Sequence, residues 1–298
     1  FGTELFDGKV GHNPIVAWVT RNSRINYKMS VIRLVDYCYS RRDEKEIQFF
    51  NKNNYYISEQ ANFSKIPGSP VAYWVSEKLA SAFEKGKSLD KIGASRSGMQ
   101  TGDNNLFLRL WQEVCFDNIK FNTKPMEDLM SIEQRWFPHP KGGAYRKWYG
   151  NLEYVVNFMH NGEDLRDFTG TSIIKNPQFY FRKGVCWSHT TSKCFSGRFM
   201  PEGCIFNVES PAFYPNNEMI LEYVLGFSNT KILDKLFGVI SQTMHYMAGD
   251  MAKIPVMNCD NIEVQDVIKM KTIDCVKIAK DDWDSYETSW GFTTHPLI

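Results

Sequence analysis

Residues 141–151 read KGGAYRKWYGN, a stretch in which basic, aromatic and glycine residues are packed more densely than elsewhere in the chain. A cation such as Arg146 can meet phosphates or base edges, and aromatic rings can stack on bases. Gly142, Gly143 and Gly150 have no Cβ, so a ligand can come close to the backbone. The stretch therefore suggests contact with nucleic acid. The alternative is a surface hairpin whose Trp and Tyr rings pack inward.

The composition is that of an ordinary globular protein. Of 298 residues, 43% are hydrophobic and 23% are charged, which allows one large domain or two modest ones. The net charge of +1 excludes bulk attraction to DNA or anionic lipid, so any anion-binding surface has to be a local patch. Residues 141–198 indicate such a patch, because nine Lys and Arg there outnumber four Asp and Glu. Residues 281–287 carry the opposite excess.

The cysteine count and the absence of targeting patterns bear on location. Seven cysteines form no CxxC pair and are odd in number, which favours a reduced, cytoplasmic compartment. No apolar run is long enough to span a membrane and no signal-peptide pattern opens the chain, so we expect no membrane partner. The sequence opens at Phe1 without Met and closes at Ile298 inside an apparent motif. We therefore expect a fragment of a longer protein.

A second polar segment, residues 96–104 (RSGMQTGDN), carries side chains that make paired hydrogen bonds to base edges. Arg suits guanine, and Asn or Gln suits adenine. Gly98 and Gly102 permit a tight turn. The segment is neither a P-loop nor a GxGxxG motif. A polar loop without a ligand is the alternative interpretation.

Three further patterns have chemical interpretations that we set aside. Cys186, His189 and Cys194, with Cys204 further on, are zinc ligand types, but their spacing matches no finger or ribbon. Core cysteines are the favoured alternative, and we expect no metal site. His189 and the polar run that ends at Lys193 are better interpreted as a loop tip that contacts bases or phosphates.

Residues 176–179 (NPQF) resemble the Asn-Pro-Pro-Tyr/Phe motif with which amino-methyltransferases hold a flipped adenine. No glycine-rich S-adenosylmethionine loop follows an upstream strand, so we predict no catalytic residue here. Residues 281–292 (DDWDSYETSWGF) contain paired carboxylates, as nuclease metal sites do. No PD-(D/E)xK arrangement accompanies them, and we predict a solvated connector anchored by Trp283 and Trp290.

Hydrophobic periodicity and turn residues predict the following elements. Paired strands are expected over 14–21 and 29–36, and further strands over 106–114, 154–159, 178–183, 184–189, 203–208 and 251–256. Helices are expected over 71–85, ending before Gly86, and over 219–226, 232–247 and 262–269. Ser228 or Asn229 is the expected N-cap of the helix over 232–247.

Six blocks carry a family resemblance: PIVAWVTRN (14–22), NFSKIPGSPVAYW (62–74), RSGMQTGDNNLFLRLW (96–111), WFPHPKGGAYRKWYGN (136–151), YVLGFSNTKI (223–232) and DDWDSYETSW (281–290). Together they resemble the PglX-type adenine-specific DNA methyltransferases of BREX phage-defence systems, which are similar in turn to type IIG restriction–modification enzymes. The resemblance covers nearly the whole chain. The RSGxxTGDN and KGGxYRKWYGN blocks are not generic motifs.

The resemblance implies an α+β fold: a mixed or mostly antiparallel β platform with flanking helices, like the target-recognition domains of type I specificity subunits. It assigns 1–45 to the closing strands of a methyltransferase domain, 46–92 to a linker and helix, 93–277 to a target-recognition domain, and 278–298 to a connector. This chain lacks the catalytic motifs of the family. We therefore expect no cofactor in this fragment and S-adenosylmethionine in the parent enzyme.

The residues and the resemblance together predict a module that reads double-stranded DNA while a separate domain flips and methylates an adenine. Interaction with other defence proteins or with an inhibitor is the alternative. The side chains expected to face DNA are Arg96, Gln100, Thr101, Asn104, Lys141, Arg146, Lys147, Tyr149, Asn151, Arg182, Lys183, His189 and Lys193.

Overall fold

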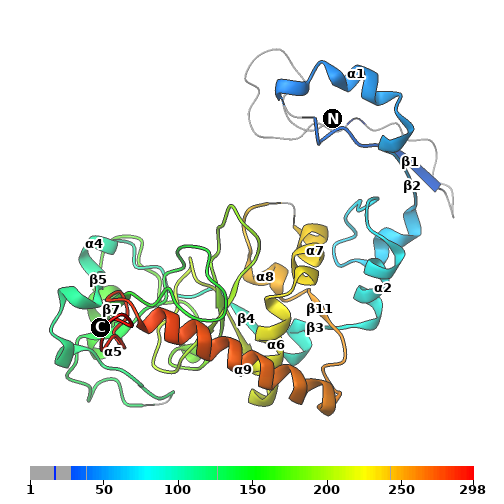
Figure 1. Cartoon of the computed structure of the whole chain (residues 1–298). Coiled ribbons are helices and arrows are strands. Elements are labelled where there is room, and N and C mark those ends of the chain that lie inside the picture. The colour runs from blue at the N-terminus through cyan, green and yellow to red at the C-terminus, as the bar shows by residue number, and fades with distance from the viewer. Residues whose placement is uncertain (1–16, 18–27, 38, 126, 242) are drawn as a thin grey trace. The chain divides into compact units, whose positions relative to one another are not determined.

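The computed structural model describes residues 17, 28–37, 39–125, 127–241 and 243–298, and the chain divides into two compact units, Phe1–Glu84 and Lys85–Ile298 (Figure 1). The smaller unit contains an antiparallel pair, β1 (Lys28–Ile32) and β2 (Tyr55–Glu59). β1 overlaps the predicted strand 29–36, but it begins one residue earlier and ends at Ile32. The strand predicted over 14–21 lies, apart from Ala17, outside the described residues, and β2 was not predicted.

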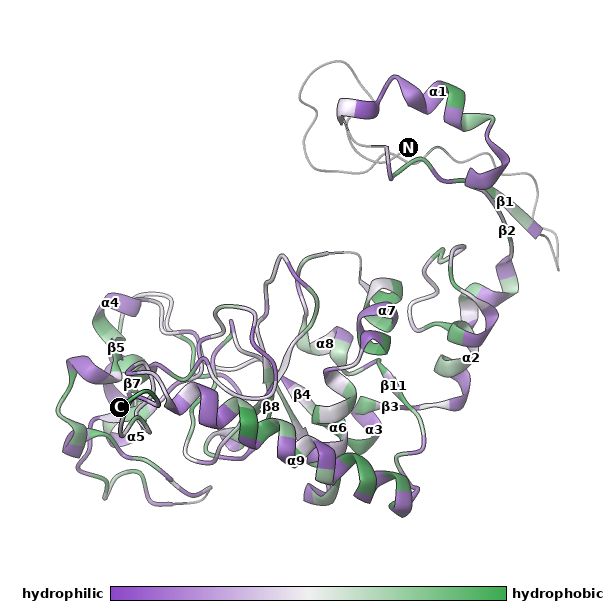
Figure 2. Cartoon of the chain, viewed as in Figure 1, coloured by the Kyte–Doolittle hydropathy of each residue, from purple (hydrophilic) through white to green (hydrophobic). Residues whose placement is uncertain are grey.

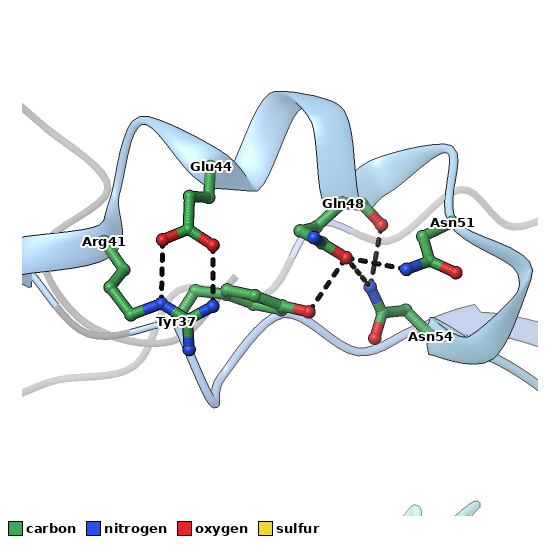
Figure 3. A network of polar contacts seen from close by, with 6 residues as sticks. All are labelled: Tyr37, Arg41, Glu44, Gln48, Asn51 and Asn54. Carbon is green, nitrogen blue, oxygen red and sulfur yellow. Dashed lines mark hydrogen bonds and ion pairs between the residues drawn. The ribbon is translucent and has the colours of Figure 1, made fainter.

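Polar side chains hold the segment between β1 and β2 together (Figure 3). Gln48, in α1 (Glu44–Phe49), accepts hydrogen bonds through Oε1 from the Tyr37 hydroxyl at 2.9 Å and the Asn51 amide at 2.8 Å. Arg41 donates two hydrogen bonds to Glu44, at 2.8 and 2.6 Å. Side-chain pairs three residues apart favour a helix, so this charge-rich stretch is helical. Short 3-10 turns flank it, η1 (Tyr39–Arg41) and η2 (Lys52–Asn54).

The rest of the smaller unit is a 3-10 turn and a helix, η3 (Gln60–Lys65) and α2 (Glu77–Lys85). The predicted helix over 71–85 is therefore confirmed only in its second half. It begins late because the chain still turns after Pro70, whose carbonyl accepts from the Ala72 amide at 2.7 Å. Ser76 Oγ accepts from the Leu79 amide at 3.3 Å, which is a capping contact.

Small antiparallel sheets form the frame of the larger unit. The largest has the order β4-β10-β8-β9, and its strands are β4 (Gly93–Arg96), β10 (Ala212–Pro215), β8 (Gly184–Trp187) and β9 (Gly197–Met200). A second has the order β5-β7-β6, with β5 (Leu108–Leu110), β7 (Tyr154–Asn157) and β6 (Trp136–Pro138). β3 (Lys87–Ser88) pairs with β11 (Pro255–Val256). The α+β class with mostly antiparallel sheets is confirmed.

Helices and 3-10 turns connect and cover these sheets. They are α3 (Leu89–Ile92), α4 (Asn104–Phe107), η4 (Trp111–Glu113), η5 (Phe116–Asn118), α5 (Met159–Asp167), η6 (Pro177–Phe179), η7 (Glu218–Ile220), α6 (Leu221–Ser228), α7 (Lys231–Ile240), α8 (Ala248–Met251) and α9 (Ile262–Asp284). α6 and α7 confirm two predicted helices, although α7 stops at Ile240 and its N-cap is Thr230. α9 has 23 residues and runs far past the predicted end at 269.

Several strand predictions are wrong. Residues 178–183 are not a strand, because Asn176 has a left-handed backbone (φ 55°) and Pro177 opens η6. The segment over 203–208 forms no regular strand pairing. Instead, the Ile205 amide donates to Pro138 O, and Phe206 O accepts from the Met99 amide. Of the strands predicted over 106–114 and 251–256, only Leu108–Leu110 and Pro255–Val256 form. In the larger unit β3, β4, β6, β9 and β10 were not predicted.

An aromatic core joins the two main sheets, and α9 closes it. Phe137, Phe158, Phe206 and Tyr214 are buried in it, together with Trp283 from the end of α9. At Gly226 of α6, an added Cβ would lie 2.6 Å from Thr272 Oγ1, so the two helices need glycine at this crossing. Figures 1 and 2 show α9 running from beside α6 toward the C-terminus, with hydrophobic and hydrophilic residues along its length. No helix among the described residues is long and apolar enough to cross a membrane.

Candidate nucleic-acid interface

Three loops that the sequence analysis singled out meet along residues 206–210. Met99 donates to Phe206 O at 2.9 Å and accepts from Val208 N at 3.0 Å, which ties the 96–104 loop to this segment. Gly142 approaches it so closely that an added Cβ would lie 2.6 Å from Glu209 O. The loop after β8 joins through His189 N, which donates to Glu209 O at 2.9 Å. Residues 206–210 therefore hold the three loops in register.

In the 96–104 loop, internal packing explains much of the motif. A Cβ on Gly98 would lie 2.1 Å from Phe206 O, so this glycine is needed for chain packing. Thr101 is buried and donates to Asn104 Oδ1 at 2.7 Å, which positions Asn104. Arg96, Gln100 and Asn104 are exposed.

The 141–151 segment is a loop fixed to the edge strand β9. Trp148 has a left-handed backbone (φ 71°), donates to Gly197 O at 2.8 Å and accepts from Phe199 N at 2.7 Å. Tyr149 is buried in the core, and burial raises the pKa of its hydroxyl. Asn151 is also buried and donates to Ala144 O at 2.8 Å. Tyr149 and Asn151 therefore stabilise the loop from within.

Arg146 is engaged by the end of α9. Its Nη1 lies 2.8 Å from Asp282 Oδ2, and its guanidinium carbon lies 5.0 Å from the Trp283 ring centre. Gly150 makes room for this stack, since an added Cβ would lie 2.4 Å from Arg146 Cδ. Trp283 thus gives Arg146 an aromatic support from a remote part of the chain.

Two more predicted lysines have partners within the protein. Lys147 Nζ donates to Asn229 O at 2.8 Å, and Lys183 Nζ pairs with Glu218 Oε2 at 2.6 Å. The hydrogen bond to Glu218 raises the pKa of Lys183. These two lysines and Arg146 therefore bind protein groups in this conformation.

Four other predicted cations rest on aromatic rings instead. Among the described residues none has a carboxylate partner. They are Arg96 over Phe179 at 5.4 Å, Lys141 over Tyr154 at 5.2 Å, Arg182 over Phe179 at 5.6 Å, and Lys193 over Tyr145 at 5.3 Å. Nη1 of Arg96 donates to Ser95 O at 2.9 Å, and its other donors are not taken up by a carboxylate. Because none of the four cations is paired with a described carboxylate, all four are available to an anionic ligand.

His189 belongs to a stacked histidine pair. Its ring lies 5.1 Å from that of His245, and the Thr190 hydroxyl contacts Nδ1 of both, at 3.2 and 2.9 Å. Lys193 and Cys194 both contact Tyr145 in the neighbouring loop. The hydrogen bond with Cys194, together with burial, raises the pKa of Tyr145 to about 12. Tyr145 is thus a neutral support for Lys193 at physiological pH.

Sequence reasoning missed the central role of Arg198. This side chain is 1% exposed, and its Nη1 and Nη2 donate to Arg146 O at 3.4 Å and to Ser188 Oγ at 3.2 Å. It therefore links the 141–151 loop to the end of β8. Burial lowers the pKa of Arg198, and burial raises the pKa of the nearby Glu153. The one available signal was a charged residue inside the apolar run GRFM.

The patterns set aside in the sequence have structural roles. Cys186 and Cys204 are buried in the core while Cys194 is exposed, and no cluster of metal-ligand side chains occurs among the residues that the structure describes. Asn176 donates through its amide to Ser97 O at 2.9 Å. In the acidic stretch, Trp283 is buried and Trp290 packs against the core, so both anchor the chain as predicted.

Comparison with known proteins identifies the class. No protein-family model matches the chain. The adenine-specific methyltransferase PglX of Lacticaseibacillus casei (strain Zhang) is 34% identical over 277 residues, which is 89% of this chain and 22% of that protein. The adenine-specific methyltransferase BrxX of Escherichia coli O9:H4 (strain HS) is 33% identical over 288 residues, 95% of this chain and 22% of that protein.

The chain is homologous to adenine-specific methyltransferases and corresponds to a portion of such an enzyme. The homology to PglX and BrxX agrees with the resemblance found in the sequence. The chain spans about a fifth of the length of the relatives it matches.

Proposed function

We propose that this chain is the DNA-recognition module of a bacterial site-specific N6-adenine DNA methyltransferase in phage defence. It positions a duplex and reads base edges, while a separate domain of the parent enzyme uses S-adenosylmethionine to methylate the adenine. Homology to PglX and BrxX supports the enzyme class. The division into methyltransferase strands (1–45), linker (46–92), target-recognition domain (93–277) and connector (278–298) belongs to this proposal.

One observation carries the proposal: Arg96, Lys141, Arg182 and Lys193 rest on rings and have no carboxylate partner among the described residues. The net charge is only +1, so a surplus of positive charge has to be local. Residues 141–198, which include three of these four cations, hold nine Lys and Arg against four Asp and Glu. Phosphates are the anions that such a surplus suits best on a nucleic-acid surface. The exposed Gln100 and Asn104 are the neighbouring candidates for reading adenine edges.

Binding of duplex DNA by the full chain is expected to weaken steeply with salt. If the four cations each neutralise one phosphate, the slope of log affinity against log salt should be about −3.6. The double variant Lys141→Ala/Lys193→Ala should reduce the size of that slope by about 1.8. Fluorescence anisotropy with a labelled duplex across a salt series measures both.

The matched control is Lys147→Ala/Lys183→Ala, which removes the same charge from two lysines already bound to protein groups. Its slope should match that of the unmodified chain. Absence of salt-sensitive DNA binding in the unmodified chain would refute the proposed function. Equal slopes for both double variants would show that ring-supported lysines are not the contacts.

Asp282→Asn is expected to strengthen DNA binding by releasing Arg146 from its carboxylate. One additional phosphate contact would increase the size of the salt slope by about 0.9. Asp281→Asn is the control, because it removes the same charge from the adjacent exposed residue and leaves the Arg146–Asp282 pair intact. The pair is half-exposed, so urea unfolding should show a loss below about 1 kcal/mol. If both variants bind DNA alike, Arg146 is only an internal anchor.

A second candidate function is binding of another protein, and the outer side of α9 favours it. Ile262, Val267, Met270, Ile273 and Ile278 are between 46% and 69% exposed there. Exposed apolar residues on one helix are typical of interaction surfaces. This alternative predicts a stable protein complex whose affinity is unchanged by Lys147→Ala or Arg182→Ala, measured by calorimetry.

A further inference from the structure

Two arginines share an aromatic support beside the four-stranded sheet. Arg96 is the last residue of β4, and Arg182 comes two residues before β8. Their guanidinium carbons lie 5.4 and 5.6 Å from the centre of the Phe179 ring. The two positive charges are therefore within roughly one screening length of each other, about 10 Å at 0.1 M salt.

The support is itself rigid. The Phe179 ring packs on the Tyr214 ring with 5.0 Å between centres, and Arg182 also lies 6.0 Å from the Tyr214 ring. Tyr214 belongs to β10, the strand between β4 and β8, and is fully buried in the core. Arginines held on such a platform lose little side-chain freedom on binding, which favours affinity.

The nearby acids do not neutralise these arginines. Glu218 pairs with Lys183 at 2.6 Å, and Glu202 pairs with Lys124. The hydrogen bond with Glu218 raises the pKa of Lys183 most, and the charges of Glu202 and Glu222 add to it. The acids thus act on lysines, and the two guanidinium groups repel each other until an anion binds between or across them.

A small cavity lies next to Arg182, and neither Arg96 nor Phe179 is among its lining residues. Its volume is about 50 Å³, and Arg182, Lys183, Tyr214 and Glu218 are among its lining residues. Pockets that enclose drug-sized ligands start at about 300 Å³, so only a small group fits. The buried Tyr214 hydroxyl has no hydrogen-bond partner among the described residues.

We propose that Arg96 and Arg182, both packed on the Phe179 ring, form a phosphate-binding site in which each arginine binds one of two successive phosphates of a DNA strand. The phosphates of a strand follow one another with about 3.4 Å of axial rise, so both arginines can reach neighbouring phosphates. The guanidinium group suits phosphate because its donors form a planar fork. The assignment of the phosphates to DNA rests on the proposed function, whereas the site for paired phosphates stands on the geometry.

Salt titration of DNA binding tests the site in its proposed role. Arg96→Ala/Arg182→Ala in the full chain should reduce the size of the log–log slope by about 1.8. Arg135→Ala is the control, because Arg135 also stacks on a ring, Trp136 at 5.8 Å, but is paired with Asp164 at 3.3 Å. Phe179→Leu keeps both charges and removes the platform. It should weaken binding while preserving the slope. An unchanged slope in the double variant overturns the proposal.

Inorganic pyrophosphate separates the site from the proposed function. It carries two linked phosphates, so millimolar pyrophosphate should raise the thermal midpoint of the unmodified chain by several degrees and that of Arg96→Ala/Arg182→Ala hardly at all. If the chain binds pyrophosphate in this way but not DNA, the site stands and DNA recognition fails. If DNA binds with an arginine-independent slope and pyrophosphate has no effect, the site fails and DNA recognition stands.

Discussion

Replacing Gly98 with alanine is expected to lower the free energy of unfolding by about 3 kcal/mol, because the added methyl group has nowhere to go. The new Cβ would lie 2.1 Å from Phe206 O and 2.7 Å from Asn207 N. Both are backbone atoms, so no side-chain rotation relieves the overlap. The chain would have to move apart at the Met99–Asn207 bridge, where three loops of the candidate interface meet.

Gly238→Ala is the matched control for this experiment. Gly238 lies in α7, and an added Cβ meets no atom within 4 Å. Alanine favours a helix over glycine, so this variant should be more stable by about 0.5–1 kcal/mol. Urea unfolding followed by circular dichroism compares the two variants. If Gly98→Ala unfolds at the same urea concentration as the unmodified chain, the close approach of the 96–104 loop to Phe206 is incorrect.

The sequence predicted those elements whose signals are local. β7 and β8 are apolar runs, and α6 and α7 have apolar residues at helical spacing. β10 was not predicted because it follows Pro211 and ends in Pro215, and proline is unusual in a central strand. It is nevertheless a central strand, because it lies between β4 and β8 in the sheet. Both partners come from other parts of the chain. Short strands of this kind are specified by tertiary pairing more than by propensity.

In the candidate site, too, local features could be predicted from the sequence and features that depend on remote residues could not. Residue types in the loop blocks indicated which side chains carry charge, and their glycines indicated close approach of the backbone. The approach at Gly98 and Gly142 is to other parts of the same chain. The sequence could not predict which cations are available to a ligand, because their partners within the protein are remote in the sequence. Arg146 and Asp282, for example, are 136 residues apart. A local sequence pattern therefore predicts which residue types lie on a surface, but not which of its charged side chains are paired with other parts of the protein.

A decrease in pH from 6.5 to 5 is expected to destabilise the larger unit by about 2 kcal/mol through His139. This side chain is fully buried, and burial lowers its pKa from 6.5 to about 3, with a smaller contribution from the charge of Lys141. The folded pKa lies below the unfolded pKa, so protonation favours the unfolded chain. The stabilisation is complete above pH 6.5 and is lost as the pH falls toward 3, at about 1.4 kcal/mol per unit.

The structural reason is a hydrogen bond that protonation destroys. Neutral His139 accepts through Nε2 from the Asn207 amide at 2.8 Å, and Asn207 Oδ1 accepts from Glu209 N at 2.8 Å. An imidazolium group has no acceptor, so acid should loosen residues 206–210 and with them the three loops. The window from pH 6.5 to 5 is informative because Asp and Glu with ordinary pKa values near 4 contribute little there. Glu153, whose pKa is raised by burial, would act in the opposite direction, since its protonation favours the folded chain.

His139→Gln tests this assignment. The amide oxygen of glutamine can accept from Asn207 but does not titrate, so the variant should be less stable at pH 7 and should lose less stability between pH 6.5 and 5. His295→Gln, near the C-terminus, is the control and should keep the slope of the unmodified chain. Urea unfolding at several pH values measures the slopes. If His139→Gln retains the full slope of the unmodified chain, another group carries the acid sensitivity, and the His139–Asn207 bond is not what holds the loops.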